Sequence, residues 1–490
     1  MSYPIQNECC SRPAKHRRKK REKALAAAAV IFMLLAGISG CALTNPTNPY
    51  APVSGYAGGA GVTPALSAQL QQKLKEPLNL ENCIEVALAN NPQIGRSSWD
   101  AEAAHAQKDV AAAQRWPSLD AVAGYRHYLD GQRLISARKP NEGGVWSSDI
   151  FSSDLVVSMP LFTGGRIVNE IGAAELLWQA ANRRLARTKD EIVFNVSSTF
   201  FSILGQRRVI ESLEFSKKAL EEHRKRVQNL MTVQKAAKVD LLRTEVRLAD
   251  LEQKLVRERN ILAIQQRLLA NLMGVLEEDT AIDVKGILEI TPVETNLKGD
   301  IERACDQRED YLAARAELEG QAKRVDAARA GRWPVISLNG SYGGRMVTGE
   351  VTRQPGAREF EDVGSAGLSL SFPLFEGGRI DANIRRERAR LASAQEGLLD
   401  LELKIRLDVQ TAVLNLTSSL ERVRATEKAI EQARESLRIE AEKYELGKGS
   451  ITDVLDSQSA LLEAETSYAR ALAEYNVSVS QYRFAIGERQ

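Results

Sequence analysis

A ten-residue phrase occurs twice in the chain and constrains its fold more than any other feature. SMPLFTGGRI begins at Ser158 and SFPLFEGGRI begins at Ser371, an offset of 213 residues (371 minus 158). The triplet Arg-Trp-Pro also recurs, at 115–117 and 332–334. Repetition of several signals at nearly one offset indicates a tandem duplication. We therefore predict two similar structural units, residues 77–290 and 291–490, each with a helix, a β-hairpin, a long helix and a further helix.

The first forty residues are typical of an export signal. A basic segment, HRRKKREK, precedes an apolar run from Ala24 to Ile38, and Ser-Gly-Cys41 follows it. A positive segment before a short apolar core is the pattern of a secretory signal peptide. The ending at Cys41 resembles a bacterial lipobox, which implies cleavage before Cys41 and its acylation, for example with palmitate. Ala42 after that cysteine implies sorting to the outer membrane, and the long basic segment suggests that translation starts downstream of Met1. The alternative is a single-pass membrane anchor.

Two further properties describe the chain after the signal, which spans residues 1–40. The segment 41–76 is rich in Pro, Gly, Ala and Asn, which predicts a linker. Without the signal, the 66 basic and 64 acidic residues fall to 58 and 62, a net charge of −4. A mildly acidic chain lacks the basic footprint of a nucleic-acid partner. Cys83 and Cys305 do not occupy equivalent repeat positions, and we expect two buried thiols. A disulfide between them is the alternative.

Long helices dominate the predicted units. Apolar residues recur in steps of three and four from Arg166 to about Gln234, and again from Arg379 to about Leu446. Close to seventy residues form a helix of about 100 Å, longer than a globular domain uses. Shorter helices are expected at 80–114 and 240–273, so that each pair stacks end to end along one long helix.

Segments with a period of two lie between the first short helix and the long helix. Ala366, Leu368 and Leu370 alternate with glycine and serine, and Ile336, Leu338 and Tyr342 share a face in the same way. Matching stripes lie at 119–128 and 155–161. Strands of about ten residues with one apolar and one polar face are typical of membrane barrels, and an ordinary half-buried sheet is the alternative. Long polar loops are expected at the hairpin tips, 127–149 and 345–362.

Four strands per chain cannot close a barrel, since about eight are the minimum and open edges are not tolerated in lipid. The chain must therefore oligomerise. The repeated phrase is then a strand-to-helix corner, in which a proline ends the strand and two glycines turn the backbone before Arg166 or Arg379 begins the helix. The corner residues are Pro160, Gly164 and Gly165 in the first unit and Pro373, Gly377 and Gly378 in the second.

These features together resemble the outer membrane factors, the TolC-like family of outer membrane efflux and secretion channels. The resemblance rests on the paired Pro-Leu-Phe-x-Gly-Gly-Arg corners, the repeated Arg-Trp-Pro, YELGKGSITDVLD at 444–456 and the lipobox. It implies a mixed, mostly α fold: a homotrimer whose twelve strands form one outer membrane β-barrel, continued by a long α-helical barrel through the periplasm. It also implies two partners, a periplasmic adaptor (membrane fusion) protein and an inner-membrane transporter, with outer membrane lipid around the barrel.

The resemblance also places a periplasmic gate at Tyr444, Asp453 and Asp456. Gly447 and Gly449 break the helix there, and Ser450 or Thr452 can cap the next helix. Asp453 has a repeat counterpart in Asp240, which favours a role at the helix start, whereas Asp456 matches Arg243 and is the better gate candidate. Acidic rings in channels favour cations. Where the family often has a basic residue, this chain has Gly449; Lys448 is the adjacent cation.

Other functions have weaker support. The histidines His16, His105, His127 and His223 lack metal-ligand spacing, and GKGS at 447–450 lacks the upstream glycine of a phosphate-binding loop. We therefore predict no enzyme, no metal and no cofactor. The rival within the channel class is type I protein secretion, and a periplasmic coiled-coil lipoprotein is a further alternative. The predicted function is a passive conduit for small molecules such as drugs and other toxic compounds; the sequence names neither cargo nor pump.

Overall fold

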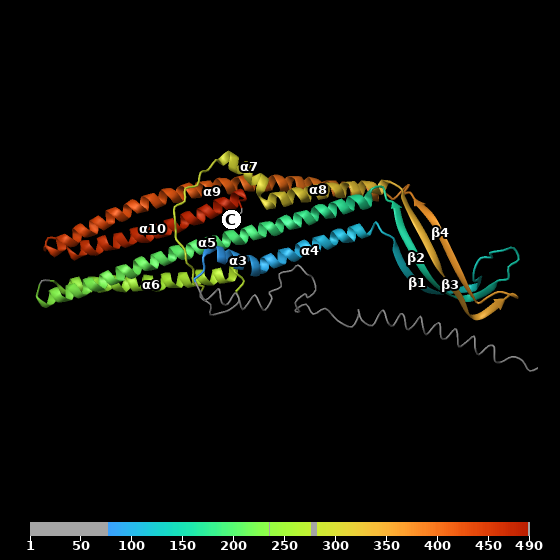
Figure 1. The fold of residues 1–490 in the computed structure, drawn as a ribbon, viewed down its shortest axis with the longest axis horizontal. Helices are drawn as coiled ribbons and strands as arrows, with labels where there is room; N and C mark the ends of the chain where they lie inside the picture. The colour runs from blue at the N-terminus through green and yellow to red at the C-terminus, as the bar shows by residue number, and fades with distance from the viewer. Residues whose placement is uncertain (1–76, 235, 276–281, 489–490) are drawn as a thin grey trace, which may run out of the picture. The chain divides into compact units, whose positions relative to one another are not determined.

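The computed structural model describes residues 77–488, except residue 235 and residues 276–281. The predicted signal peptide, the linker and Cys41 lie outside the described residues. Within them the elements follow one order twice: α3, α4, β1, β2, α5, α6, then α7, α8, β3, β4, α9, α10, with a short 3₁₀ turn before β3 (Figure 1). The tandem arrangement of the sequence is therefore a repetition of secondary structure.

Two helices of 67 residues are the longest elements, as predicted. They are α5 (Arg166–Thr232) and α9 (Arg379–Glu445), and each begins at the arginine that follows a corner. Neither helix contains proline, so its backbone hydrogen bonds continue uninterrupted. Among the described residues, no helix combines the length and the apolar content that crossing a membrane requires.

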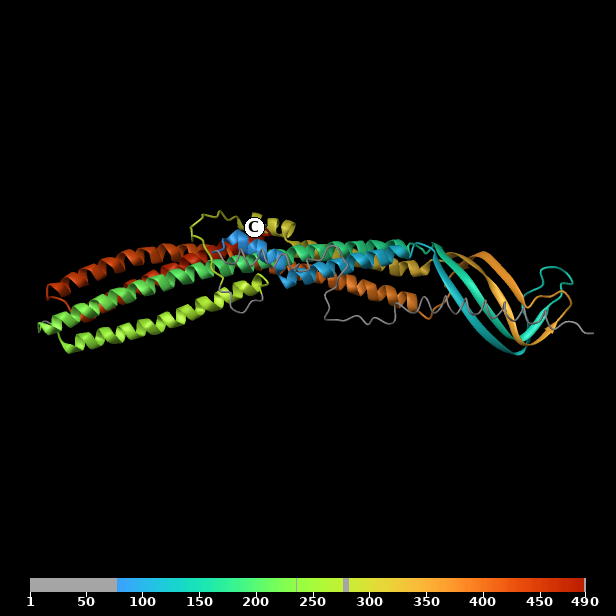
Figure 2. The ribbon, with the colours of Figure 1, turned by 60° about the horizontal axis from the view of Figure 1, so that its bottom comes forward.

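Shorter helices pack end to end along the two long ones. α4 (Pro92–Ala113) and α6 (Lys238–Leu272) both pack on α5, while α8 (Glu309–Arg329) and α10 (Ile451–Ile486) both pack on α9 (Figures 1 and 2). α8 and α10 also pack on α5, which joins the two repeats. The helices therefore form one curved layer whose outermost members are α4 and α6 on one side and α9 on the other.

The helix expected over 80–114 is wrong as a single element. It is two helices, α3 (Leu80–Asn90) and α4, because Asn91 has extended backbone angles before Pro92. The second repeat breaks in the same way between α7 (Leu297–Gln307) and α8, at Arg308, although no proline is present. Each break lets the short helices turn toward the ends of α6 and α10.

The four strands form one antiparallel sheet in the order β1-β2-β3-β4. They are β1 (Ser118–Arg133), β2 (Val145–Phe162), β3 (Val335–Arg353) and β4 (Phe360–Ser371). The four strands form as predicted, but all four run farther toward the hairpin tips. The long loops expected at 127–149 and 345–362 are therefore wrong: the hairpins close over residues 134–144 and 354–359. A small apolar cluster of Leu134, Val145, Val347 and Ala357 supports the strands there.

The corners form as predicted at the glycines and differ at the prolines. The glycine pairs, Gly164 with Gly165 and Gly377 with Gly378, all have positive φ, between 59° and 87°, which favours glycine. Pro160 does not end β2: it lies inside the strand, next to a register shift that accommodates its missing N–H. Pro373 lies just beyond the end of β4.

A polar joint holds each break between the short helices. In the first repeat, the Asn91 side-chain amide donates to the Leu272 carbonyl at 2.8 Å. In the second, Arg308 lies beside the Ala485 carbonyl, 213 positions after Leu272, at 3.5 Å. A glycine with positive φ, Gly274 or Gly487, follows each of these helix ends. In both repeats, therefore, the side chain at the break contacts one of the last carbonyls of α6 or α10, and a glycine with positive φ ends that helix.

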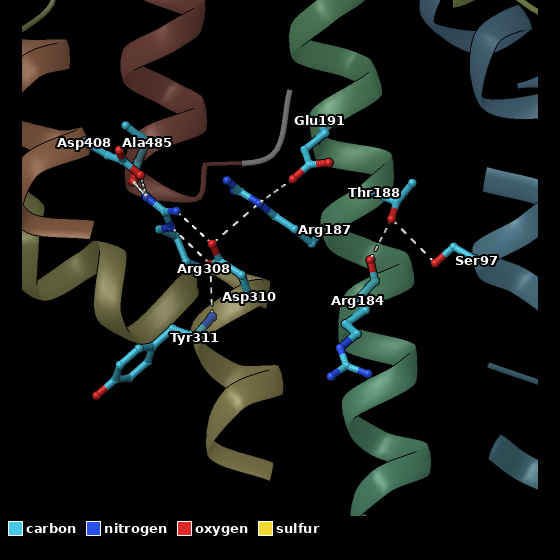
Figure 3. Close-up of polar contacts among 10 residues, drawn as sticks. All are labelled: Ser97, Arg184, Arg187, Thr188, Glu191, Arg308, Asp310, Tyr311, Asp408 and Ala485. Carbon is cyan, nitrogen blue, oxygen red and sulfur yellow. Dashed lines mark hydrogen bonds and ion pairs between the residues drawn. The ribbon is translucent and has the colours of Figure 1, made fainter. Parts of the chain in front are cut away.

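Arg308 adds an ion-pair network to the second joint (Figure 3). Its guanidinium is 3% exposed and contacts Asp310 at 2.7 Å and Asp408 at 3.0 Å. Burial alone would lower the pKa of Arg308, but its hydrogen bonds to these carboxylates raise it. Arg187 from α5 stacks on Phe484, 3.8 Å from the ring centroid, and also faces Asp310. The network joins α5, α8, α9 and α10.

Candidate functional site

The sheet carries an apolar face that nothing covers within the chain. Leu119, Leu368 and Leu370 are each more than two-thirds exposed. The pairing register places further apolar side chains on the same face. They include Leu155, Val157, Leu338 and Tyr342. A continuous exposed apolar surface of this kind requires a partner or lipid.

The opposite face of the sheet is a ladder of small polar side chains. Ser337 and Ser369 hydroxyls lie 2.8 Å apart, and the Asn339 amide donates to Ser369 at 2.8 Å. Farther along, the Ser341 and Ser365 hydroxyls lie 2.9 Å apart. An Asp154–Arg345 ion pair and a hydrogen bond between Ser158 and Asn339 belong to the same face. This face suits water.

Aromatic side chains flank the apolar band at both ends. The end nearest the helices has Trp116, Phe162, Trp333, Phe372 and Phe375. The tip end has Tyr125, Phe151 and Phe360, which lie level with Met346 in the ladder. The band between Ile336 and Met346 on β3 spans ten residue steps, or about 25 Å for strands tilted by roughly 40°. Such girdles about 25 Å apart mark the two interfaces of outer membrane barrels.

Both layers of the chain end in open edges. β1 and β4 are the outer strands of the described sheet and have no strand beyond them. On the helix layer, α9 exposes one face with Leu399, Leu403, Leu407 and Leu414, each at least 52% exposed. α6, at the other edge, exposes a stripe that includes Val239, Leu242, Val246, Ile264 and Leu268. The two edges present apolar stripes that can pack on each other between copies.

The turns after α5 and α9, here called the far turns, lie side by side at the end of the helices remote from the sheet (Figure 1). Their two hairpins share a core that contains Val227, Leu248, Ile451 and Leu455. Tyr444 packs at the margin of this core. Burial, with the nearby Asp240 carboxylate, raises the pKa of Tyr444. The predicted gate residue is therefore part of the contact between the two turns.

Asp453 serves the start of α10. Its carboxylate accepts from the Ser450 backbone N–H, and the Ser450 hydroxyl accepts from the Thr452 N–H at 3.2 Å. Asp240 does the same for α6, accepting from the Ala237 N–H at 3.3 Å. The repeat comparison in the sequence anticipated this shared capping role.

Asp456 forms an ion pair that the sequence did not reveal. Its carboxylate lies 2.9 Å from the Arg247 guanidinium on α6. One helical turn earlier, Arg243 donates to the Thr452 hydroxyl at 3.0 Å. Two arginines of the first repeat thus contact the start of α10. Their four-residue spacing on one helix face was the available signal, but only the fold shows which carboxylate they meet.

His223 adds a pH-dependent contact to the far turns. Its ring lies 6.0 Å from that of Tyr444, and its buried Nε2 has no hydrogen-bond partner among the described residues. Burial, with a contribution from the Arg226 charge, lowers the pKa of His223. The neutral form is therefore the one that packs here.

Acidification should loosen the far turns. Below the ordinary histidine pKa of about 6.5, His223 in the opened segment binds a proton, whereas the packed form resists protonation. The local free energy of opening therefore decreases as the pH decreases. Hydrogen–deuterium exchange at pH 5.5 and pH 7.5, corrected for intrinsic rates, should show faster exchange around residues 220–232 and 440–456 at the lower pH. His223→Phe should remove the difference. Equal protection at both pH values would contradict this prediction.

The described residues contain no group of three or more His, Cys, Asp or Glu side chains placed to bind a metal ion. Cys83 and Cys305 are free thiols, and burial raises the pKa of Cys83 to about 12. Cys83 is therefore protonated and packs as a small apolar side chain. The expectation of two free thiols is confirmed, but the expected burial is wrong for Cys305, which is only half-buried.

Several known proteins resemble the chain over most of its length. TolC of Vibrio cholerae is 23% identical over 84% of this chain and 90% of that protein, and OprJ of Pseudomonas aeruginosa is 25% identical over 93% and 94%. Both are named as outer membrane proteins. The solved outer-membrane channel OprN matches with a TM-score of 0.70 and 20% identity, covering 84% of this chain and 90% of that one.

The family comparison matches each repeat separately. The model described as "Outer membrane efflux protein" covers residues 83–275 and 301–488, which is most of the chain. The fold of the structural neighbours agrees with a β-barrel that continues into an α-helical barrel. The predicted fold class and the outer membrane location are confirmed. The chain belongs to the outer membrane efflux protein family.

Proposed function

We propose that three copies of this chain form an outer membrane channel, the exit duct of a tripartite efflux system. The open edges carry the proposal: β4 of one copy would pair with β1 of the next, and α9 would pack on α4 and α6. Head-to-tail contacts of this kind close into a ring when the rotation fits. Three four-stranded sheets give twelve strands, enough to close a barrel with an aqueous interior.

The environments of the two corners support a ring in which first and second repeats alternate. Gly164 lies against the second repeat: a Cβ there would come within 2.5 Å of the Trp333 Cβ. Gly377, its repeat equivalent, has no neighbour within 4 Å in the single chain. Trp116, the repeat equivalent of Trp333, is 71% exposed. In the proposed ring, Trp116 of the neighbouring copy would occupy the space beside Gly377.

The channel would act as a passive conduit for small molecules, including drugs and other toxic compounds. A periplasmic adaptor and an inner-membrane transporter would deliver the cargo, and acylated Cys41 would anchor the chain to the outer membrane. A bacterial strain that lacks its own outer membrane efflux channel tests this. Expression of the chain together with its adaptor and transporter should restore resistance to exported compounds. Unchanged sensitivity, with the protein present in the outer membrane, would contradict efflux.

We also propose that the far turns form the gate, with Tyr444 and Asp456 in the contact that holds it closed and Asp453 as the helix cap. The Arg247–Asp456 pair links the two hairpins of one chain. An exposed pair contributes up to about 1 kcal/mol. Three symmetric pairs would contribute up to about 3 kcal/mol, which is roughly a hundredfold in the ratio of closed to open channels.

Asp456→Ala should therefore increase conductance in planar bilayers, and Arg247→Ala should do the same. The double charge exchange, Asp456→Arg with Arg247→Asp, should return conductance toward that of the unmodified channel. A matched control is the exposed Arg422–Glu474 pair, at 2.8 Å but far from the turns. Glu474→Ala should leave the single-channel record unchanged. If Asp456→Ala also leaves it unchanged, Asp456 takes no part in the gate.

A further inference from the structure

A pocket of about 720 Å³ lies at the junction between the sheet and the helices of the second repeat. Its walls combine two chemistries. Trp333, Leu370 and Phe372 form the apolar wall. The charged wall consists of Arg329 at the end of α8, Arg332 in the 3₁₀ turn and Arg388 in the first part of α9. Leu370 belongs to the lipid-facing stripe of β4, so the apolar wall continues the outer face of the barrel.

The arginines leave one positive charge without a partner. Arg329 pairs with Asp326 at 2.8 Å and Arg332 with Asp381 at 2.5 Å. Arg388 is exposed and has no ion pair or hydrogen bond within the part of the chain that the structure describes. Three guanidinium groups against two carboxylates give the pocket a net charge of +1. A ligand with one negative charge would balance it.

The first repeat shows that the corner does not need this charge. Ala112 and Glu175 stand at the positions equivalent to Arg329 and Arg388, while Arg115 and Trp116 match Arg332 and Trp333. The first twelve residues of α9, 379–390, hold five arginines against two acids, a net charge of +3, whereas the equivalent residues of α5, 166–177, have a net charge of −1. The cationic pocket is therefore a property of the second repeat alone.

We propose that this pocket binds the phosphodiester headgroup of an anionic phospholipid in the periplasmic leaflet of the outer membrane. Guanidinium groups bind phosphate oxygens through paired N–H donors, and basic pockets at membrane interfaces hold anionic headgroups. The apolar wall of Trp333, Leu370 and Phe372 would receive the first part of the acyl chains. The inference rests on the proposed barrel and its place in the membrane, but not on channel activity.

Two other sources of a ligand differ in chemistry. The acyl chains on Cys41 would fill the apolar side but carry no phosphate, so they leave the charge unbalanced. Free phosphate would meet the arginines and leave the apolar wall empty. A phospholipid satisfies both walls at once, which is why the structure favours it.

Native mass spectrometry of the full, lipid-modified protein in mild detergent tests the proposal. Dioleoylphosphatidylglycerol should bind at least about tenfold more tightly than dioleoylphosphatidylcholine. Both lipids offer phosphate oxygens to the arginines, but the choline cation cancels the charge of the phosphate and repels the unpaired Arg388 guanidinium. Arg388→Glu, which copies the first repeat, should remove that preference, and Arg388→Gln should weaken it. Arg424→Gln, an exposed arginine farther along α9 that pairs with Glu421, should have no effect.

Any of four results would overturn the proposal. Equal retention of the two lipids would show that the pocket does not distinguish them by charge. A preference that survives in Arg388→Glu would show that Arg388 does not bind the headgroup. Full competition by inorganic phosphate would assign it to the free anion. Full occupancy by phosphatidylglycerol only in the Cys41→Ser protein would show that the chain's own acyl groups fill the pocket. Far-ultraviolet circular dichroism of each variant confirms that the helices are intact, and channel conductance does not enter the result.

Discussion

Arg308→Ala should lower the free energy of unfolding by about 3 kcal/mol, one of the two largest effects that we expect from a single substitution. The change removes the cation that Asp310 and Asp408 face and leaves the Asp310 carboxylate partly buried beside Arg187 alone. Removing one partner of a buried ion pair costs about 3–5 kcal/mol, and the half-exposed Asp408 places this case at the lower end. Denaturant unfolding followed by circular dichroism measures the loss.

The equivalent joint of the first repeat supplies the matched control. Asn91→Ala removes the hydrogen bond to the Leu272 carbonyl and the cap of α4, but it leaves no charge behind. Its cost should be about 1 kcal/mol, the usual loss for a helix cap. Equal losses for the two variants would mean that the Arg308 network contributes nothing beyond capping.

Gly164→Ala should have the other large effect, again a loss of about 3 kcal/mol in the free energy of unfolding. Its φ of 63° disfavours any residue with a Cβ, at about 1–2 kcal/mol. The new methyl would also lie 2.5 Å from the Trp333 Cβ and 2.9 Å from the Ala330 carbonyl oxygen, so the corner must shift. Overpacking of this kind costs about 1–3 kcal/mol. Unfolding of the purified protein and its amount in the outer membrane both report the loss.

Gly377→Ala separates folding from assembly. Its φ of 59° carries the same backbone cost, but no atom lies within 4 Å in the single chain. The chain should fold with a smaller loss of about 1–2 kcal/mol, while the fraction of trimer falls because Trp116 of the neighbouring copy would meet the new methyl. A normal trimer fraction for Gly377→Ala would contradict the proposed contact between Gly377 and Trp116.

The periodicity of apolar residues was sufficient to predict the helices and strands that have one apolar face. The period of two revealed the strands through Leu155, Leu338 and Leu368, and steps of three and four revealed α5 and α9. The glycine pairs marked both corners because only glycine readily adopts their positive φ. The signals were weaker at the hairpin tips, where polar residues are frequent and the apolar cluster of Val145, Val347 and Leu134 forms only when the two hairpins meet.

Contacts between the repeats could not be predicted in this way. The break at Arg308 has neither proline nor glycine, so it depends on tertiary packing against Asp408 and the end of α10. The Arg247–Asp456 pair joins residues 209 positions apart, and no local pattern specifies such a pair. Resemblance to the family placed Tyr444, Asp453 and Asp456 at a gate, but the arginine partner comes from the other repeat in this chain.

The number of chains in the protein purified from the outer membrane tests the central claim most directly. Native mass spectrometry in mild detergent measures it without any assumption about cargo or pump. The open edges of the sheet and of the helix layer predict one species with the mass of three chains, in which the strand signal of the circular dichroism spectrum persists. A stable single chain with the same helix and strand content would contradict the account, because its four strands would then leave two edges unpaired in the membrane.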